Sequence, residues 1–307
     1  MTATAAAAST TVRLRRWLSV RHSLGLEAAL VLSLYGVYEL ARGLVVGNTT
    51  KADRHAEQLV AVERSLHLFV EGRVQHAVDA LPGLAGLLGI AYLTLHLAVT
   101  AVVLLWLNRR RPAAFPFVRT TLLVASALAL VGFLAYPAAP PRLAGIGIAD
   151  TVSSGHVDLN HGLVSSLYNP YAAVPSMHFG YAFIVATSLL RYGEGRLVRT
   201  VGAVYPAFVL LVVVATGNHF FLDAAAGALV AGLAMAAASL LTRPAVRTAP
   251  IAFPMREVTE SIVRLLRWPG SVFVRSWTAF VTDGSRLVAG SPPVQRLDRL
   301  AAQRKRR

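Results

Sequence analysis

Six long apolar blocks, separated by polar segments, limit what this chain can fold into more than any other feature of its sequence. A helix needs about 20 predominantly apolar residues to cross a bilayer. The blocks that approach or exceed this length are Leu24–Val46, Gly83–Leu107, Thr120–Pro137, Ser176–Arg191, Thr200–Gly217 and His219–Leu241. Pro206 in the fifth block is tolerated because neighbouring helices can satisfy the freed backbone groups. The pattern predicts an all-α, polytopic membrane bundle of six transmembrane helices in one domain, residues 24–241.

The formal net charge of +15 raises the question of a nucleic-acid partner, but the placement of the basic residues argues against one. They gather before the first block, between the second and third, between the fourth and fifth, and after the sixth. The segments Gly47–Pro82 and Ala138–Pro175 carry no such excess. Arginine-rich loops stay in the cytoplasm. We therefore expect residues 1–23 and the basic tail, residues 242–307, to be cytoplasmic, with membrane lipids and no nucleic acid as partners.

The segments outside the apolar blocks give weaker signals. The chain has no cysteine, which excludes disulfides, thiolate nucleophiles and cysteine-ligated zinc.

Ala52–Leu81 alternates polar and apolar residues at helical spacing, which predicts one amphipathic helix along the outer membrane surface. A helix packed across the bundle is an equally good interpretation. The tail mixes arginine with aromatic and aliphatic residues, which fits either helices on anionic lipid or a solvated tail.

Two stretches place histidines where a polar loop meets an apolar run. NPYAAVPSMHFGYAF begins at Asn169 and TGNHFFLDAAAG begins at Thr216. Ionisable side chains at a membrane boundary are costly and usually mark function. His219 and Asp223 are four residues apart, so a helix would place them on one face. The predicted topology brings both stretches to the outer side, which indicates a phosphate-handling site at the level of the lipid headgroups.

These two stretches resemble the second and third motifs of the type 2 phosphatidic acid phosphatase superfamily, usually PSGH and SRxxxxxHxxxD. The matches are PSMH, ending at His178, and HFFLD, beginning at His219. The surrounding residues are similar to the branch that contains inositol phosphorylceramide synthases. The resemblance covers Tyr92 to Leu241. It implies phosphoryl transfer without metal or cofactor, in which His219 attacks phosphorus, Asp223 orients His219, and His178 protonates the leaving oxygen.

The chain departs from the superfamily pattern in its phosphate-binding cations. The first motif, KxxxxxxRP, is missing, and Ala135 and Val213 stand where a lysine and an arginine are usual. Arg142, just past the third block, is the candidate phosphate ligand, with interfacial anchoring as the alternative. Ser176 is a second candidate, because a helix N-terminus binds anions, and capping of the helix is compatible with that role.

Further polar residues near the motifs are candidates for the pocket wall. They are Tyr92, His96, Tyr136, Asn169, Tyr171 and Asn218. An interhelical hydrogen bond is the leading alternative for His96, and turn formation is the alternative for the asparagines. The loop between the third and fourth blocks contains His156, His161, Asp150 and Asp158. A metal site there is conceivable, but solvated loop residues are the better interpretation, and no metal site is predicted.

The leading hypothesis is a lipid phosphotransferase that acts through a phosphohistidine on a phospholipid or polyprenyl-phosphate-type substrate. A lipid phosphodiester with an alcohol acceptor is favoured because so few cations are present. A lipid phosphate or pyrophosphate phosphatase is the first alternative, and a non-catalytic lipid-binding or transport protein is the second. We expect a multi-pass protein of a bacterial plasma membrane, with its site on the extracytoplasmic side.

The topology can be tested by cysteine labelling, because the chain has no native cysteine. A cysteine at Asn160 should react with a membrane-impermeant maleimide added to intact cells, since the charge pattern puts this loop outside. A cysteine at Arg196 should react only after the membrane is opened. Labelling of position 160 from the cytoplasmic side alone would overturn the orientation.

Overall fold

The computed structural model describes residues 12–14, 17–18, 20–44, 49–152 and 169–242. Every described residue belongs to one compact unit, which lies within Met1–Phe253. The helices are α2 (Leu24–Leu44), α3 (Thr49–Ser65), α4 (Glu71–Asp79), α5 (Leu84–Arg110), α6 (Phe115–Ala135), the short 3₁₀ helix η1 (Pro141–Leu143), α8 (Met177–Tyr192), α9 (Arg196–Ala215) and α10 (Phe221–Leu241). The described ranges contain no strand. The predicted basic tail lies outside them, apart from Thr242.

Five of these helices, α2, α5, α6, α9 and α10, are long and apolar enough to cross a membrane. The all-helical, multi-pass class predicted from the apolar blocks is therefore confirmed. The fourth predicted span, Ser176–Arg191, corresponds to α8, whose 16 residues are too few to meet the same length criterion. The sixth crossing stays a prediction, because nothing in the structure defines where a bilayer would lie.

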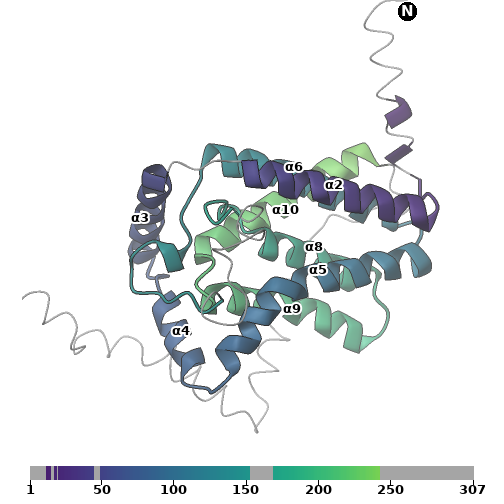
Figure 1. Cartoon of the computed structure of the whole chain (residues 1–307). Helices are drawn as coiled ribbons and strands as arrows, with labels where there is room; N and C mark the ends of the chain where they lie inside the picture. Colours follow the sequence, from purple (N-terminus) through teal and green to yellow (C-terminus); the bar gives the residue numbers. More distant parts are fainter. Residues whose placement is uncertain (1–11, 15–16, 19, 45–48, 153–168, 243–307) are drawn as a thin grey trace, which may run out of the picture. The chain divides into compact units, whose positions relative to one another are not determined.

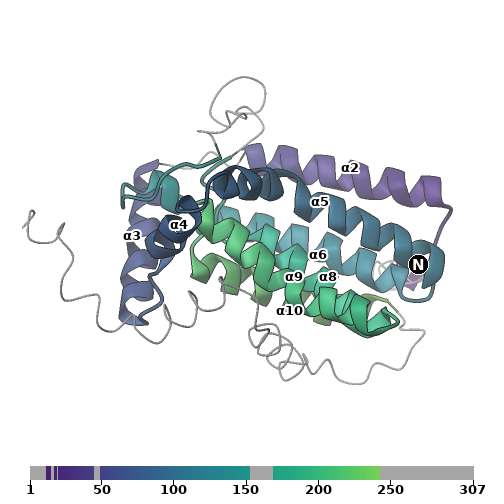
Figure 2. The ribbon, with the colours of Figure 1, turned by 90° about the horizontal axis from the view of Figure 1, so that it is seen from below.

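Helix α8 lies at the centre of the bundle, packed against α5, α6, α9 and α10. Two views show α8 enclosed by longer helices (Figures 1 and 2). The contact between α8 and α10 depends on small residues. A Cβ on Gly227 would lie 2.2 Å from the Ser176 carbonyl oxygen, and one on Gly180 would lie 3.1 Å from the Gly227 carbonyl oxygen. Small residues thus allow α8 and α10 to pack closely.

Helix α2 packs against α6 and exposes most of its remaining apolar side chains. A buried ion pair fixes its first turn, with 2.5 Å between Arg119 Nη1 and Glu27 Oε1. Arg119 also donates to the backbone oxygen of Leu18 at 2.8 Å. Helix α6 begins at Phe115, five residues before the predicted span. The earlier start is possible because proline is tolerated in the first turn of a helix and because Glu27 neutralises the buried Arg119.

The segment between the first two spans contains two helices, so the prediction of one continuous amphipathic helix over Ala52–Leu81 is corrected. Helix α3 ends at Ser65, and His67 then adopts a left-handed conformation with φ of 56°. Both helices pack on the end of the bundle, α3 against α10 and α4 against α5 and α9 (Figures 1 and 2). Gln75 of α4 donates to the Ala149 carbonyl oxygen at 2.9 Å and accepts from its N–H at 2.8 Å. These contacts agree with the second interpretation of this segment, in which it packs across the bundle.

We predict that Gly227→Ala destabilises the protein while Gly232→Ala in the same helix does not. A methyl group at 227 would collide with the Ser176 carbonyl oxygen, and overpacking of this kind costs about 1–3 kcal/mol. Position 232 has no atom within 4 Å of an added Cβ, so alanine there should add about 0.5–1 kcal/mol through helix propensity. Thermal unfolding in detergent checks both changes. Equal midpoints for the two variants would contradict the packing that we describe.

Candidate functional site

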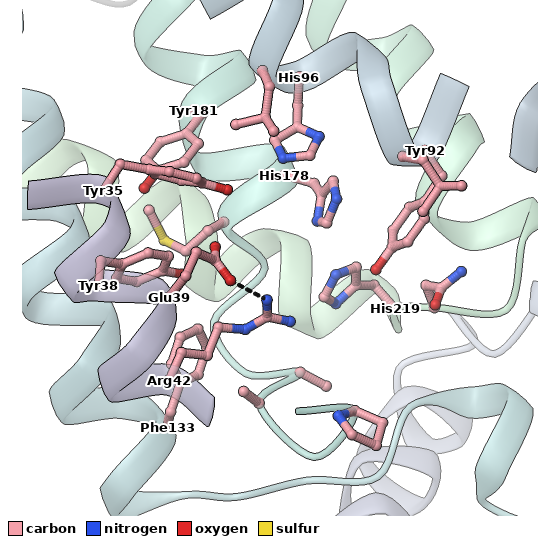
Figure 3. A pocket seen from close by; sticks show the side chains of 17 residues that line it. Tyr35, Tyr38, Glu39, Arg42, Tyr92, His96, Phe133, His178, Tyr181 and His219 are labelled. Carbon is pink, nitrogen blue, oxygen red and sulfur yellow. Dashed lines mark hydrogen bonds and ion pairs between the residues drawn. The ribbon is translucent and has the colours of Figure 1, made fainter. Parts of the chain in front are cut away.

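A cavity of about 170 Å³ lies at the end of the bundle where the two histidine motifs meet (Figure 3). It opens between the last turns of α2, the first half of α5 and the start of α8. Its lining combines cationic, acidic and aromatic side chains. The lining residues are Tyr35, Tyr38, Glu39, Arg42, Tyr92, Leu93, His96, Leu97, Phe133, Pro170, Ala172, Ala173, Met177, His178, Tyr181, Asn218 and His219.

Backbone hydrogen bonds hold the motif segments together beneath this pocket. The N–H of Ser176, just before α8, donates to the carbonyl oxygen of Asp223 in the first turn of α10, at 2.9 Å. The N–H of Arg142 donates to the Gly217 carbonyl oxygen at 2.9 Å. Gly217 has φ of +68°, and a Cβ there would lie 3.0 Å from the Ala149 carbonyl oxygen. Glycine therefore suits the turn that delivers His219 into the pocket.

His219 and Asp223 form a pair, with 3.3 Å between His219 Nδ1 and Asp223 Oδ2. The sequence predicted this contact, but the reason differs. His219 precedes α10, so the two residues do not share a helix face. Asp223 lies in the first turn of α10, where its Oδ2 also accepts from the Phe220 N–H at 2.9 Å. The carboxylate thus caps the helix and holds Nδ1 of the imidazole, so that Nε2 is the ring nitrogen on the other side.

His178 stands opposite His219 in the first turn of α8. Their ring centroids are 5.6 Å apart. Two residues of α5 fix the His178 ring: Tyr92 stacks on it with centroids 4.3 Å apart, and His96 meets it at a tilt with centroids 4.0 Å apart. Tyr92 and His96 were predicted as candidates for the pocket wall, and both line the pocket (Figure 3). Their contacts with His178 position a proton donor or acceptor next to His219.

The other predicted site residues lie behind or beside the pocket. Ser176 is fully buried and caps α8, with its Oγ 3.5 Å from the Phe179 nitrogen. Asn169 contacts the backbone of α2 through its side chain, 3.1 Å from the Arg42 oxygen. Tyr136 and Tyr171 pack with residues of α3 in a smaller hydrophobic cluster. Asn218 is the remaining candidate that lines the cavity.

Arg142, the predicted phosphate ligand, does not line this cavity. Its buried guanidinium forms an ion pair with Asp150, 2.7 Å between Nη1 and Oδ2, and donates to Asn218 Oδ1 at 3.0 Å. The structure therefore brings Arg142 to the back of the pocket wall, where it holds Asn218. The predicted neighbours His156, His161 and Asp158 lie outside the described residues. Within the described part of the chain, no group of three His, Cys, Asp or Glu side chains is arranged to hold a metal ion.

Arg42 and Glu39, from the last turns of α2, line the pocket and were not among the predicted site residues. They form an ion pair, 3.1 Å between Arg42 Nη1 and Glu39 Oε2 (Figure 3). A signal for them existed in the sequence, because charged residues inside an apolar span are costly and mark function. Among the cavity's described lining residues, Arg42 is the one arginine or lysine. It supplies the pocket with a cation from a helix that carries neither motif.

Two buried glutamates behind the pocket were also not predicted from the sequence. Glu63 of α3 and Glu71 of α4 are both fully buried. Glu63 Oε1 accepts from the Leu222 N–H at 2.8 Å, so it caps α10 from a segment 159 residues away. Burial and the hydrogen bond with Glu71 raise the pKa of Glu63 to about 9. At neutral pH Glu63 is therefore protonated, next to the first turn of α10.

The fold and the site together define a class: an all-helical protein with several helices apolar enough to cross a membrane, and a histidine-lined pocket at one end of the bundle. Residues 57–237, more than half of the chain, match the family described as the PAP2 superfamily. The chain belongs to the PAP2 superfamily, whose members are generally phosphatases or phosphotransferases that act on lipid phosphates. The comparisons with curated proteins and with solved structures found no significant match. The inositol phosphorylceramide synthase branch stays a prediction.

We predict that the stability of the protein falls as the pH rises from about 5 to about 9, and that Glu63 causes part of the fall. The pKa of Glu63 in the folded state, about 9, exceeds its ordinary value of 4.5. The folded state therefore holds a proton that the unfolded state releases, so this contribution is complete below 4.5 and is lost as the pH rises through about 9.

Glu63→Gln should flatten this pH dependence, because glutamine keeps a carbonyl acceptor for the Leu222 N–H and does not titrate. Glu57→Gln, at an exposed position of the same helix, is the control and should leave the slope unchanged. Thermal unfolding midpoints measured across this pH range in detergent would show the difference. A slope for Glu63→Gln equal to that of the unmodified protein would mean that another group titrates.

Proposed function

We propose that this protein is a membrane lipid phosphotransferase that works through a phosphohistidine on His219. The observation that carries the proposal is the arrangement of His219, held at Nδ1 by Asp223, opposite His178 across a pocket that also contains an arginine. A base or nucleophile held by a third group, with an acid facing it, is the general arrangement for nucleophilic catalysis. Membership of the PAP2 superfamily supports phosphoryl transfer as the reaction class.

In the first step, Nε2 of His219 attacks the phosphorus of the lipid substrate. The new N–P bond forms as the bond between phosphorus and the leaving oxygen breaks. His178, in its protonated form, gives its proton to that oxygen, so the leaving group departs as a neutral alcohol. Asp223 accepts the hydrogen bond from Nδ1–H of His219 and stabilises the positive charge on the ring.

In the second step, the hydroxyl of an acceptor attacks the phosphohistidine. Neutral His178 takes the hydroxyl proton as the new P–O bond forms and the N–P bond breaks. His219 returns to its neutral form and His178 to its protonated form, so the enzyme is ready for another cycle. When the substrate is a phosphodiester, an alcohol acceptor gives a new phosphodiester and water gives a phosphate monoester. When the substrate is a monoester, water gives free phosphate.

The charge in the pocket favours transfer between phosphodiesters over hydrolysis of a monoester. A phosphate monoester carries close to two negative charges at neutral pH, and a diester carries one. Arg42 supplies the cation among the described lining residues, and Glu39 pairs with it. Arg142 pairs with Asp150 behind the wall. A pocket with one arginine, itself paired with a glutamate, suits a singly charged phosphodiester or pyrophosphate-linked lipid, with an alcohol as acceptor.

The distribution of arginine supports a site on the extracytoplasmic side. The pocket lies where α8 and α10 begin and α2 ends, whereas Arg109, Arg110 and Arg191 lie at the other ends of α5 and α8. The positive-inside rule assigns the arginine-rich end to the cytoplasm. This assignment supports a headgroup pocket that faces away from the cytoplasm.

We expect His219→Ala and His178→Ala each to abolish turnover, and Asp223→Asn to reduce it. Loss of a general acid or base lowers the turnover rate by about 10²–10⁴-fold, and we expect a loss of this size for His178→Ala. His76→Ala is a matched control, because His76 is an exposed histidine of α4. Mass spectrometry of protein quenched in alkaline denaturant should detect the transferred phosphoryl group, with any ester group that it retains, on His219 during turnover. Full activity of His219→Ala on every lipid tested would refute the phosphohistidine mechanism.

The reaction type is settled by giving purified protein a panel of lipids with and without an acceptor alcohol. The panel contains phosphatidic acid, a polyprenyl monophosphate and a phosphoinositol or glycosyl-phosphate lipid. Headgroup transfer from the diesters, with slow release of phosphate from the monoesters, is the expected result. Rapid release of phosphate from the monoesters without transfer would favour the phosphatase. Binding of these lipids without any turnover would favour the non-catalytic alternative.

A further inference from the structure

Glu39 is an unexpected residue in a pocket for an anionic substrate. Its side chain lines the same cavity as Arg42, His178 and His219. A carboxylate repels a phosphate group in so small a space, and such a repulsion needs a compensating interaction. The ion pair with Arg42 compensates part of it, with 3.1 Å between Arg42 Nη1 and Glu39 Oε2. The Glu39 side chain nevertheless keeps 28% of its surface exposed, so a ligand can reach the carboxylate while the ion pair stays intact.

Glu39 belongs to one face of α2 that is directed into the pocket. Tyr38, Glu39 and Arg42 follow Tyr35 at helical spacings of three, four and seven residues, which place all four on one side of the helix. All four line the cavity. Arg42 is also tied to the segment that leads to α8, because Asn169 Nδ2 donates to its carbonyl oxygen at 3.1 Å. The last turns of α2 therefore present a guanidinium, a carboxylate and two phenol rings to the pocket.

This face of α2 lies across the pocket from the proposed nucleophile. Figure 3 shows Tyr38 and Glu39 on one side of the cavity and His219 on the other, with the Arg42 guanidinium between them. In phosphoryl transfer the attacking and the leaving atoms lie roughly in line, on opposite sides of phosphorus. With His219 on one side, the leaving group and the acceptor that later takes its place lie on the other. A carboxylate on that side is therefore placed to contact the acceptor.

The chemistry of the second step limits what Glu39 can bind. An ionised carboxylate only accepts hydrogen bonds, so its ligand must supply donors such as hydroxyl groups. The proton of the reacting hydroxyl goes to His178 and is not available to Glu39. A hydrogen bond from an alcohol to Glu39 therefore needs a second hydroxyl on that alcohol. A simple alcohol has none, whereas a vicinal diol has one beside the reacting oxygen.

We propose that Glu39 binds a second hydroxyl group of the acceptor, and that the acceptor of this protein is a polyhydroxylated alcohol. The oxygen of the first hydroxyl bonds to phosphorus and its proton passes to His178, while the N–P bond to His219 breaks. The neighbouring hydroxyl donates to the Glu39 carboxylate, and hydrogen bonds to an ionised group are among the strong ones. The inference rests on the proposed function, because it concerns the second step of the same reaction.

The first experiment compares two acceptors that differ by one hydroxyl group, cis-1,2-cyclohexanediol and cyclohexanol. Both are added at equal concentration to protein that turns over a phosphoinositol or glycosyl-phosphate lipid, and the two transfer products are quantified by mass spectrometry. Because both products form from the same phosphohistidine, their ratio does not depend on how fast the donor binds or reacts. The unmodified protein should favour the diol by about 10–100-fold, as expected for one hydrogen bond to a charged group.

Two substitutions test whether Glu39 causes this preference. Glu39→Leu removes the acceptor and should abolish the preference. Glu39→Gln keeps one carbonyl acceptor without the charge and should give an intermediate ratio. Glu57→Gln is the control, because Glu57 is an exposed acid of α3 that does not line the cavity, and its ratio should equal that of the unmodified protein. Slower turnover with an unchanged ratio in both Glu39 variants would mean that Glu39 only pairs with Arg42, and the inference would be wrong.

A binding measurement separates this inference from the proposed function. Saturation-transfer difference NMR should detect cis-1,2-cyclohexanediol on the detergent-solubilised protein above the signal from micelles alone. The signal should fall to that background in Glu39→Leu, fall in part in Glu39→Gln, and persist in Glu57→Gln. Loss of binding in the Glu39 variants, with no turnover of any lipid by the unmodified protein, would support the hydroxyl site and refute the phosphotransferase. Equal signals in all four proteins, with turnover present, would refute the hydroxyl site and leave the phosphotransferase standing.

Discussion

The hydrogen bond from the Ser176 N–H to the Asp223 carbonyl oxygen joins the two motif helices at their first turns, and the site depends on it. It can form only because Gly227 and Gly180 let α8 and α10 approach closely. The same contact sets the distance between His178 and His219. A bulkier residue at this crossing would separate the helix starts and so the two imidazoles.

The start of α10 is stabilised by groups that are remote in sequence. Phe220, at the N-cap, has no side chain that can accept a hydrogen bond. Asp223 accepts from the Phe220 N–H and Glu63 accepts from the Leu222 N–H, so two otherwise unsatisfied donors are bonded. The carboxylate that orients His219 therefore also holds the helix. The segment α3–α4 is part of the site's support, which explains why it packs on the bundle with its acids buried.

The first long helix contributes to the site in a way that the motifs do not reveal. Arg42 lies outside residues 57–237, which match the PAP2 superfamily. Membership of the superfamily thus accounts for the histidines and Asp223 but not for the cation beside them. Helix α2 therefore builds the wall of the pocket together with the motif segments.

The sequence by itself determined the helices and the contact between His219 and Asp223, because both are encoded locally. Apolar length fixes a membrane helix, and the described ends of the five long helices lie within about five residues of the predicted spans. The spacing of His219 and Asp223 was likewise sufficient to predict their contact, although capping, not a shared helix face, produces it. Only the tertiary structure decided which arginine lines the pocket. Arg142 lies next to the motif segments but is drawn away by Asp150, whereas Arg42 arrives from the far end of α2. It also decided that Glu63 and Glu71 are buried and that residues 52–81 form two helices, because these outcomes depend on which surfaces meet when distant segments pack.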